Sequence, residues 1–198
     1  RSLFARAEAR GRTPAFANAS PRGFQESAYG RRPAAPPLAA HSAGVLVRHE
    51  EALGRGDAVA SEIVNTGWRR RLGVRDLPEL TPEEAGENLA RIAGGADVTL
   101  FAHYSTDIAG HRGGLEGSVA ALERVDAFLG GLWASAPPDL AILVTSDHGN
   151  VEDVRAGHTT NPALAVASGP AAEWYRTDPR PTESLTDVGE FLLGPEEG

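Results

Sequence analysis

The sequence contains neither cysteine nor lysine, so arginine is its only permanently basic side chain. Without cysteine, the chain can form neither a disulfide framework nor a thiolate metal site, and any metal must be held by carboxylates and imidazoles. The sequence also has no apolar run near the roughly 18 residues that a membrane-spanning helix needs. We therefore expect a protein without a membrane partner, located in the cytoplasm.

The formal net charge of -8 argues against nucleic acid as a partner, because nucleic-acid binding requires a basic face. The charge is unevenly distributed. Residues 1–76 carry 13 arginines and 7 acidic residues, whereas residues 77–198 carry 6 arginines and 20 acidic residues. An acidic half suits cation binding, although a solvated acidic surface is the commoner explanation. For the arginine-rich stretch 22–75, we expect a solvated basic surface, with a role in holding a phosphate as the alternative.

Methionine is absent as well, and the chain starts with Arg1. This pattern predicts a sequence whose beginning is missing, so the presence of a signal peptide cannot be judged. A chain of 198 residues with 41% apolar content suffices for one globular domain with a sizeable core, and is short for two. Its oligomeric state cannot be inferred.

Two patterns of apolar residues alternate along the chain: helical spacing and short continuous runs. Helical spacing predicts helices over 3–10, 81–94, 115–133 and 184–194, and apolar runs predict strands over 14–19, 97–104, 139–146 and 163–168. The second helix carries a capping box, with Thr81 before Pro82 and Glu84. Strands that are apolar throughout and alternate with helices predict the α/β class, with a mostly parallel sheet and helices on both faces. Residues 20–80 are rich in proline and glycine, and we expect them to form a small cap or an irregular excursion within this domain.

Five side chains able to bind metal follow the ends of predicted strands. Asp107 and His111 come after the strand 97–104, Asp147 and His148 come after the strand 139–146, and His158 lies in the next loop. In open α/β sheets, ligands bind beyond the carboxyl ends of the strands. Each motif alone has an ordinary explanation, such as a surface ion pair or a loop histidine. Together they predict one metal site built from loops at one edge of the sheet.

The neighbouring polar residues have simpler interpretations. His103, at the end of a strand, is expected to be a hydrogen-bonded histidine of the core or rim. Glu152 and Asp153 either cap a following turn or orient a metal ligand, and a helix cap is the favoured interpretation. His41 and His49 are assigned no role.

The wording of the three motifs resembles a known family. "TDIAGH", "TSDHGNVED" and "GHTTNP" match the metal-binding motifs of the alkaline phosphatase superfamily in order and spacing, over residues 97–170. The resemblance is greatest to the metalloenzyme domain of its cofactor-independent phosphoglycerate mutase and phosphopentomutase branch. It implies an alkaline-phosphatase-like fold and two divalent metal ions, manganese or zinc, with magnesium also suited. It also implies a small phosphate ester as the substrate.

The resemblance assigns roles to the five candidates. It implies that Asp107, His111 and His158 hold one metal, and that Asp147 and His148 contribute to the other. In the family, the second metal also takes an aspartate near the first strand and the nucleophilic serine or threonine.

Those two family residues precede the segment that here reads "SLFARAEARG", so the nucleophile is expected upstream of residue 1. Residues 1–198 would then be a single metalloenzyme domain that lacks its N-terminal segment, and this chain alone is expected to be inactive. We do not assign the role of nucleophile to Ser105, Ser146 or Thr159.

The function expected from these motifs is phosphoryl transfer, because two cations a few Å apart stabilise both the attacking and the leaving oxygen. Residues 20–80 are short for the second domain of the mutases, which favours a phosphatase over a glycolytic mutase. Two alternatives stay open: hydrolysis of a phosphodiester or sulfate, and a catalytically silent metal-binding domain. A Ser-His-Asp hydrolase is disfavoured, because the sequence has no G-x-S-x-G motif.

Overall fold

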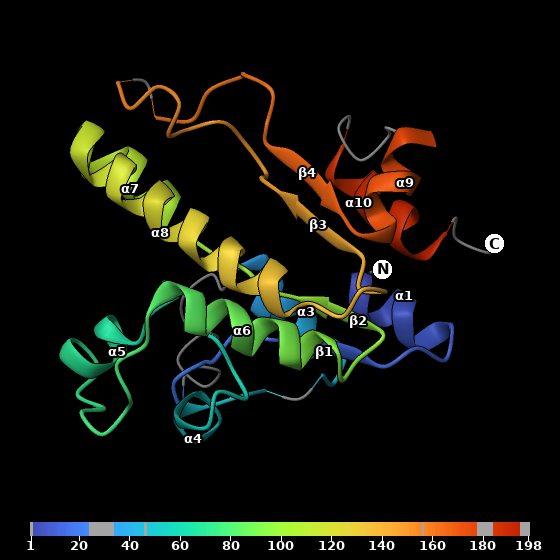
Figure 1. The fold of residues 1–198 in the computed structure, drawn as a ribbon, viewed down its shortest axis with the longest axis horizontal. Coiled ribbons are helices and arrows are strands. Elements are labelled where there is room, and N and C mark those ends of the chain that lie inside the picture. The colour runs from blue at the N-terminus through green and yellow to red at the C-terminus, as the bar shows by residue number, and fades with distance from the viewer. Residues whose placement is uncertain (1, 24–33, 46, 156, 178–183, 195–198) are drawn as a thin grey trace. The chain divides into compact units, whose positions relative to one another are not determined.

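A computed structural model describes residues 2–23, 34–45, 47–155, 157–177 and 184–194 (Figure 1). The chain divides into two compact units. Unit 1 comprises Arg1–Ser105 and Ala120–Ala136, and unit 2 comprises Thr106–Val119 and Pro137–Gly198. Both units combine helices with strands, so the predicted α/β class is confirmed, with short strands and small sheets. The expectation of a single domain over residues 1–198 stays a prediction.

Unit 1 is built around a pair of parallel strands. Its described elements are α1 (Leu3–Ala9), β1 (Pro14–Phe16), α3 (Ala35–Ser42), α4 (Glu50–Gly54), α5 (Thr66–Arg70), α6 (Pro82–Ala93), β2 (Val98–Leu100) and the C-terminal part of α8 (Gly114–Ser135). β1 pairs with β2 in register, Pro14 opposite Val98. Phe4 of α1 packs edge-on against Phe16 of β1 in a buried apolar cluster. This burial fixes α1 against the sheet.

The predicted capping box is present at the start of α6. Thr81 Oγ1 accepts the backbone N–H of Glu84 over 3.2 Å, and the Glu84 carboxylate accepts the N–H of Thr81 over 2.7 Å. α6 then packs closely on α8. A side chain added at Gly86 or Gly131 would overlap the backbone of the other helix, so both positions require glycine. The long helix predicted over 115–133 is confirmed, and it corresponds to α8.

The described part of segment 20–80 contains α3, α4 and α5. Leu53 of α4 and Trp68 of α5 are buried in one apolar cluster with Leu77. The segment therefore contributes to the core of unit 1 in spite of its proline and glycine content.

Unit 2 contains an antiparallel pair of strands. Its described elements are α7 (Ser105–Arg112), the N-terminal part of α8, β3 (Ile142–Thr145), β4 (Ala165–Ser168), α9 (Pro170–Thr177) and α10 (Leu185–Leu193). β3 pairs with β4 with Ile142 opposite Ser168. α9, which the periodicity does not predict, starts directly after β4 and packs on it. The connection from β3 to β4, residues 146–164, extends toward α7 and carries three of the five candidate ligands (Figure 1).

Within the described ranges, none of the helices combines the length and the apolar character needed to cross a bilayer.

Candidate metal centre

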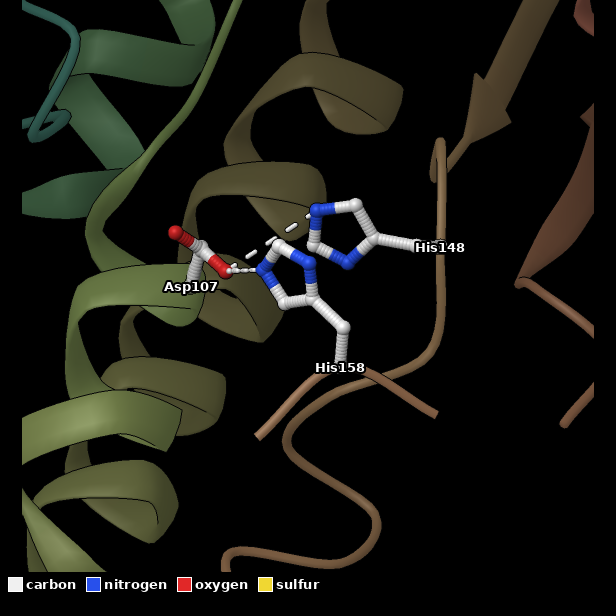
Figure 2. Close-up of side chains that lie close together, drawn as sticks. All are labelled: Asp107, His148 and His158. Atoms are coloured by element: carbon white, nitrogen blue, oxygen red, sulfur yellow. Dashed lines mark hydrogen bonds and ion pairs between the residues drawn. The ribbon is translucent and has the colours of Figure 1, made fainter. Parts of the chain in front are cut away.

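Three imidazoles surround one carboxylate oxygen in unit 2. The Nε2 atoms of His158, His111 and His148 lie 3.1, 3.3 and 3.9 Å from Oδ1 of Asp107. The Nε2 atoms of His111 and His158 are 3.0 Å apart. Figure 2 shows Asp107 pointing from its helix toward the rings of His148 and His158. Four of the five candidate ligands thus converge, and Asp107 lies at their centre.

Asp107 and His111 lie on a helix, not in the loop that was predicted from the sequence. The segment that follows β2 forms α7, and the two residues are one turn apart on it. The difference has a simple origin, because "STDIAGHR" contains no proline and carries its acidic residue in the first turn, as a helix favours. An i,i+4 pair places both side chains on one face, so the helix aims them together.

His148 and His158 come from two turns of the connection between β3 and β4. The N–H of Thr159 donates to the carbonyl of Gly149 over 2.9 Å, which forms an isolated antiparallel bridge. This bridge joins the two turns directly after the histidines. The two imidazoles stack with ring centroids 3.7 Å apart and planes inclined by 27°.

Asp147 lies at the margin of this group. Its Oδ1 is 3.6 Å from His148 Nε2, and its side chain is 68% exposed. The carboxylates of Asp107 and Asp147 therefore approach the same imidazole nitrogen. The ligand role of each of the five residues remains a prediction.

Neighbouring residues favour the ionised form of the Asp107 carboxyl. Partial burial acts to raise the pKa of its carboxyl, but hydrogen bonds from Asn150 and His158 and the nearby imidazoles outweigh it, so this pKa is lowered. Asn150 is itself buried, and its Nδ2 donates to Asp107 Oδ1 over 2.6 Å. Asn150 was not among the residues expected from the sequence to have a role. Its place in the "DHGN" turn was the available signal.

Glu152 does not cap a helix, contrary to the favoured interpretation. Residues 151–155 form turns, and the Glu152 carboxylate instead accepts the N–H of Asn150 over 2.6 Å, Nδ2 of Asn161 over 3.0 Å and the hydroxyl of Thr159. These contacts, with Thr159 contributing most, lower the pKa of Glu152 to about 2. Asp153 pairs with Arg155, which likewise lowers the pKa of Asp153 to about 2.

Two of the three hydroxyls that were not assigned as nucleophile form hydrogen bonds within the connection between β3 and β4. Ser146 Oγ donates to the carbonyl of His148 over 2.8 Å, and Thr159 Oγ1 donates to Glu152. Ser105 begins α7. His103, in unit 1, has its Nδ1 2.8 Å from the carbonyl oxygen of Ser61, as expected for a partnered histidine, and burial lowers its pKa.

The residues present fit a divalent cation. Neutral imidazoles and carboxylates form a donor set suited to zinc or manganese, with no thiolate to favour softer ions. Bonds of about 2.0–2.1 Å in a tetrahedral site set neighbouring ligand atoms about 3.3–3.4 Å apart. Asp107, His111 and His158 hold their facing atoms 3.0–3.3 Å apart, which is close to that spacing. The remaining nitrogen of His148, Nδ1, faces the Gly149 carbonyl at 3.3 Å, and this leaves Nε2 toward the cluster.

Comparison with known proteins gives one family and a set of relatives. Residues 83–193 match the family described as Metalloenzyme superfamily. This range includes all five candidate ligands. The chain is similar to proteins named 2,3-bisphosphoglycerate-independent phosphoglycerate mutase. It is 35% identical to that of Rhodopseudomonas palustris over 119 residues, which is 53% of this chain and 24% of the relative. It is 31% identical to that of Mycoplasmopsis synoviae over 102 residues, 47% of this chain and 20% of the relative.

The similarity to these relatives is partial in length. The chain spans about a quarter or less of each of these mutases, and the protein of Wolinella succinogenes, 38% identical over 80 residues, aligns over 39% of this chain and 16% of its own length. No solved structure matches the chain.

Proposed function

We propose, because this chain belongs to the Metalloenzyme superfamily, that it binds divalent metal and serves phosphoryl transfer on a small phosphate ester. Asp107, His111 and His158 would hold one metal ion, manganese or zinc. Asp147 and His148 would contribute to a second. The observation that carries the proposal is the convergence of three imidazole nitrogens on Asp107 Oδ1 from two separate segments of the chain.

The protein's own residues account for the charge and orientation of such a site. Asp107 and Asp147 offset part of the cationic charge, while neutral imidazoles keep the site from becoming strongly anionic. The i,i+4 spacing on α7 orients Asp107 and His111, and the Gly149–Thr159 bridge orients His148 and His158. Bound metal would supply electrostatic stabilisation of the phosphoryl oxygens during transfer.

The relatives favour one type of transfer. Those named above are mutases, which supports movement of a phosphoryl group within a small phosphate ester rather than its loss to water. This differs from the preference for a phosphatase that the short segment 20–80 suggested. An isotope distinguishes the two, since hydrolysis in ¹⁸O-labelled water places the label in inorganic phosphate, whereas intramolecular transfer does not.

The test of the metal assignment is metal content by elemental mass spectrometry after purification without chelators. We expect one to two equivalents of manganese or zinc in the protein, and a clear loss in His111→Ala and in His158→Ala. The control is His41→Ala, an exposed histidine of α3. Full metal content in both ligand variants would overturn the assignment. A panel of phosphate monoesters, diesters and sulfates, assayed with the added metal, then tests the substrate class.

A further inference from the structure

We infer that Glu152 is a positioning residue whose carboxylate holds together the two turns that carry His148 and His158. We call this set of contacts the Glu152 clasp, formed by Glu152 with Asn150, Thr159 and Asn161. The inference rests on the proposed function in that the histidines it positions are the proposed ligands. The clasp itself consists of contacts among residues that bind no metal in the proposal.

Each oxygen of the Glu152 carboxylate serves a different turn. Oε2 accepts the backbone N–H of Asn150, 2.6 Å away, in the turn that follows His148. Oε1 accepts the hydroxyl of Thr159 and Nδ2 of Asn161, the latter 3.0 Å away, in the turn that follows His158. One side chain therefore joins both turns by hydrogen bonds to a charged acceptor, which are stronger and shorter than neutral ones.

The backbone beneath the clasp is built to admit it. A side-chain carbon added at Gly149 would overlap both Thr159 Oγ1 and Glu152 Oε1. The absence of a side chain at this position lets the carboxylate and the hydroxyl approach the turn. The Thr159 N–H, bonded to the Gly149 carbonyl, forms the second link between the same turns.

The clasp also reaches the third proposed ligand through Asn150. The backbone N–H of Asn150 donates to Glu152, while its buried side chain donates to Asp107. Glu152 and Asp107 are thus connected through one residue. Displacement of the turn at Asn150 would be felt at the carboxylate on α7 as well as at the two histidines.

The consequence is that the imidazoles are brought together before a metal binds. His148 and His158 lie on irregular segments and are partly exposed, so neither a helix nor a strand holds them in place. Outer contacts that orient ligands in this way typically change metal affinity by about 10- to 100-fold when they are removed. Glu152 acts through the histidines and contacts none of them in the structure, which distinguishes it from a ligand.

The experiment compares Glu152→Gln with Asp153→Asn. Both variants remove one negative charge in the same turn, but Asp153 bonds to Arg155 within its own turn and does not reach the second one. Affinity for Zn²⁺ is measured by competition with a chelator. Amide hydrogen exchange at residues 147–161 is measured in the metal-free protein. For Glu152→Gln we expect about 10- to 100-fold weaker zinc binding and faster exchange at Asn150 and Thr159. Asp153→Asn should match the wild-type protein in both zinc affinity and amide exchange.

A milder variant keeps the test valid if Glu152→Gln folds poorly. Asn161→Ala removes one donor from Glu152 at an exposed position and leaves the charge unchanged. It should weaken zinc binding in the same direction by a smaller factor.

Unchanged exchange in Glu152→Gln would overturn the clasp, even if zinc binding fell, because the loss would then follow from charge alone. Equal zinc affinity in Glu152→Gln and Asp153→Asn would overturn the positioning role. If the unchanged protein binds no zinc or manganese, the proposed function fails, and the exchange measured in metal-free protein still decides whether Glu152 joins the turns.

Discussion

The buried side chain of Asn150 donates to Asp107 Oδ1 over 2.6 Å, the same oxygen that faces the imidazoles. A carboxylate cannot donate at neutral pH, so the nearer atom of Asn150 must be its nitrogen. This hydrogen bond holds the Asp107 side chain in one orientation. Asn150 therefore links the "DHGN" turn to α7.

Asn150→Ala should weaken metal binding and reduce stability. The variant leaves the charged carboxylate without its buried donor, and a hydrogen bond to a charged group is worth about 1.5–3 kcal/mol. We expect a loss of that order in the free energy of unfolding and about 10- to 100-fold lower zinc affinity. Urea denaturation and chelator competition measure the two effects. The control is Asn88→Ala, which removes a partly buried asparagine of α6, outside the metal centre. Equal zinc affinity in the two variants would contradict the role of Asn150.

Gly110→Ala should act on the same contact from the other side. Gly110 is buried in α7, and a side-chain carbon there would overlap the amide of Asn150. Alanine improves helix propensity by about 1 kcal/mol, but overpacking costs about 1–3 kcal/mol, so we expect net destabilisation and weaker zinc binding.

The matched control for that variant is Gly117→Ala in α8, where an added side-chain carbon meets nothing. There the propensity gain should act alone, and stability should rise by up to about 1 kcal/mol. Thermal unfolding of both variants measures the difference. A gain at Gly110 equal to that at Gly117 would show that Asn150 can move away without cost.

Much of the site could be predicted because its ligands follow strand ends and carry strong side-chain chemistry. His111, His148 and His158 were grouped from their positions alone, and the structure brings them around Asp107. The helix at α7 was missed because a short segment after a strand has too few residues for its periodicity to show. The start of α6 at Thr81 was predicted correctly, because a capping box is a local pattern of fixed spacing.

The supporting contacts could not be predicted for a different reason. The partners of Glu152 lie up to nine residues away, and their approach depends on how the turn at Gly149 folds. Propensity and periodicity describe neighbours along a helix or strand, and residues 151–155 belong to neither. The antiparallel pairing of β3 with β4 was likewise beyond the sequence, because an apolar run does not specify strand direction.

Asp107→Asn should abolish stabilisation by metal. An ion that binds only the folded protein stabilises it by about 2.7 kcal/mol at 100 times its dissociation constant, which corresponds to about 5–10 °C in the unfolding midpoint for a chain of this size. We expect zinc or manganese to raise the midpoint of the unchanged protein by about this amount. The variant lacks the central carboxylate and should show little change.

Differential scanning calorimetry with and without added metal measures that shift. Asp126→Asn, in α8 of unit 1, removes the same charge at a residue outside the metal centre and should keep the full shift. A metal-induced shift in Asp107→Asn as large as that in Asp126→Asn would contradict the central place of Asp107.

His103 should make the metal-free protein less stable at mildly acidic pH. Burial lowers its pKa, the hydrogen bond to the Ser61 carbonyl opposes this, and Arg124 adds to the lowering. The unfolded chain takes up a proton below a pH of about 6.5, whereas the folded chain resists protonation until its lowered pKa is reached. Stability therefore falls as the pH drops from about 6.5 toward that lowered pKa, and His103 adds no pH dependence well above a pH of about 6.5.

His103→Asn isolates this effect, because its amide can donate to the Ser61 carbonyl as Nδ1–H does, yet it does not titrate. Urea denaturation of both proteins at pH 7.5 and 5.5, with a chelator present, gives the comparison. We expect the fall in unfolding free energy between the two pH values to be smaller in the variant. Contributions that the two proteins share cancel in the difference. An equal fall in both would show that His103 accepts a proton as readily when folded as when unfolded, against the effect of its burial.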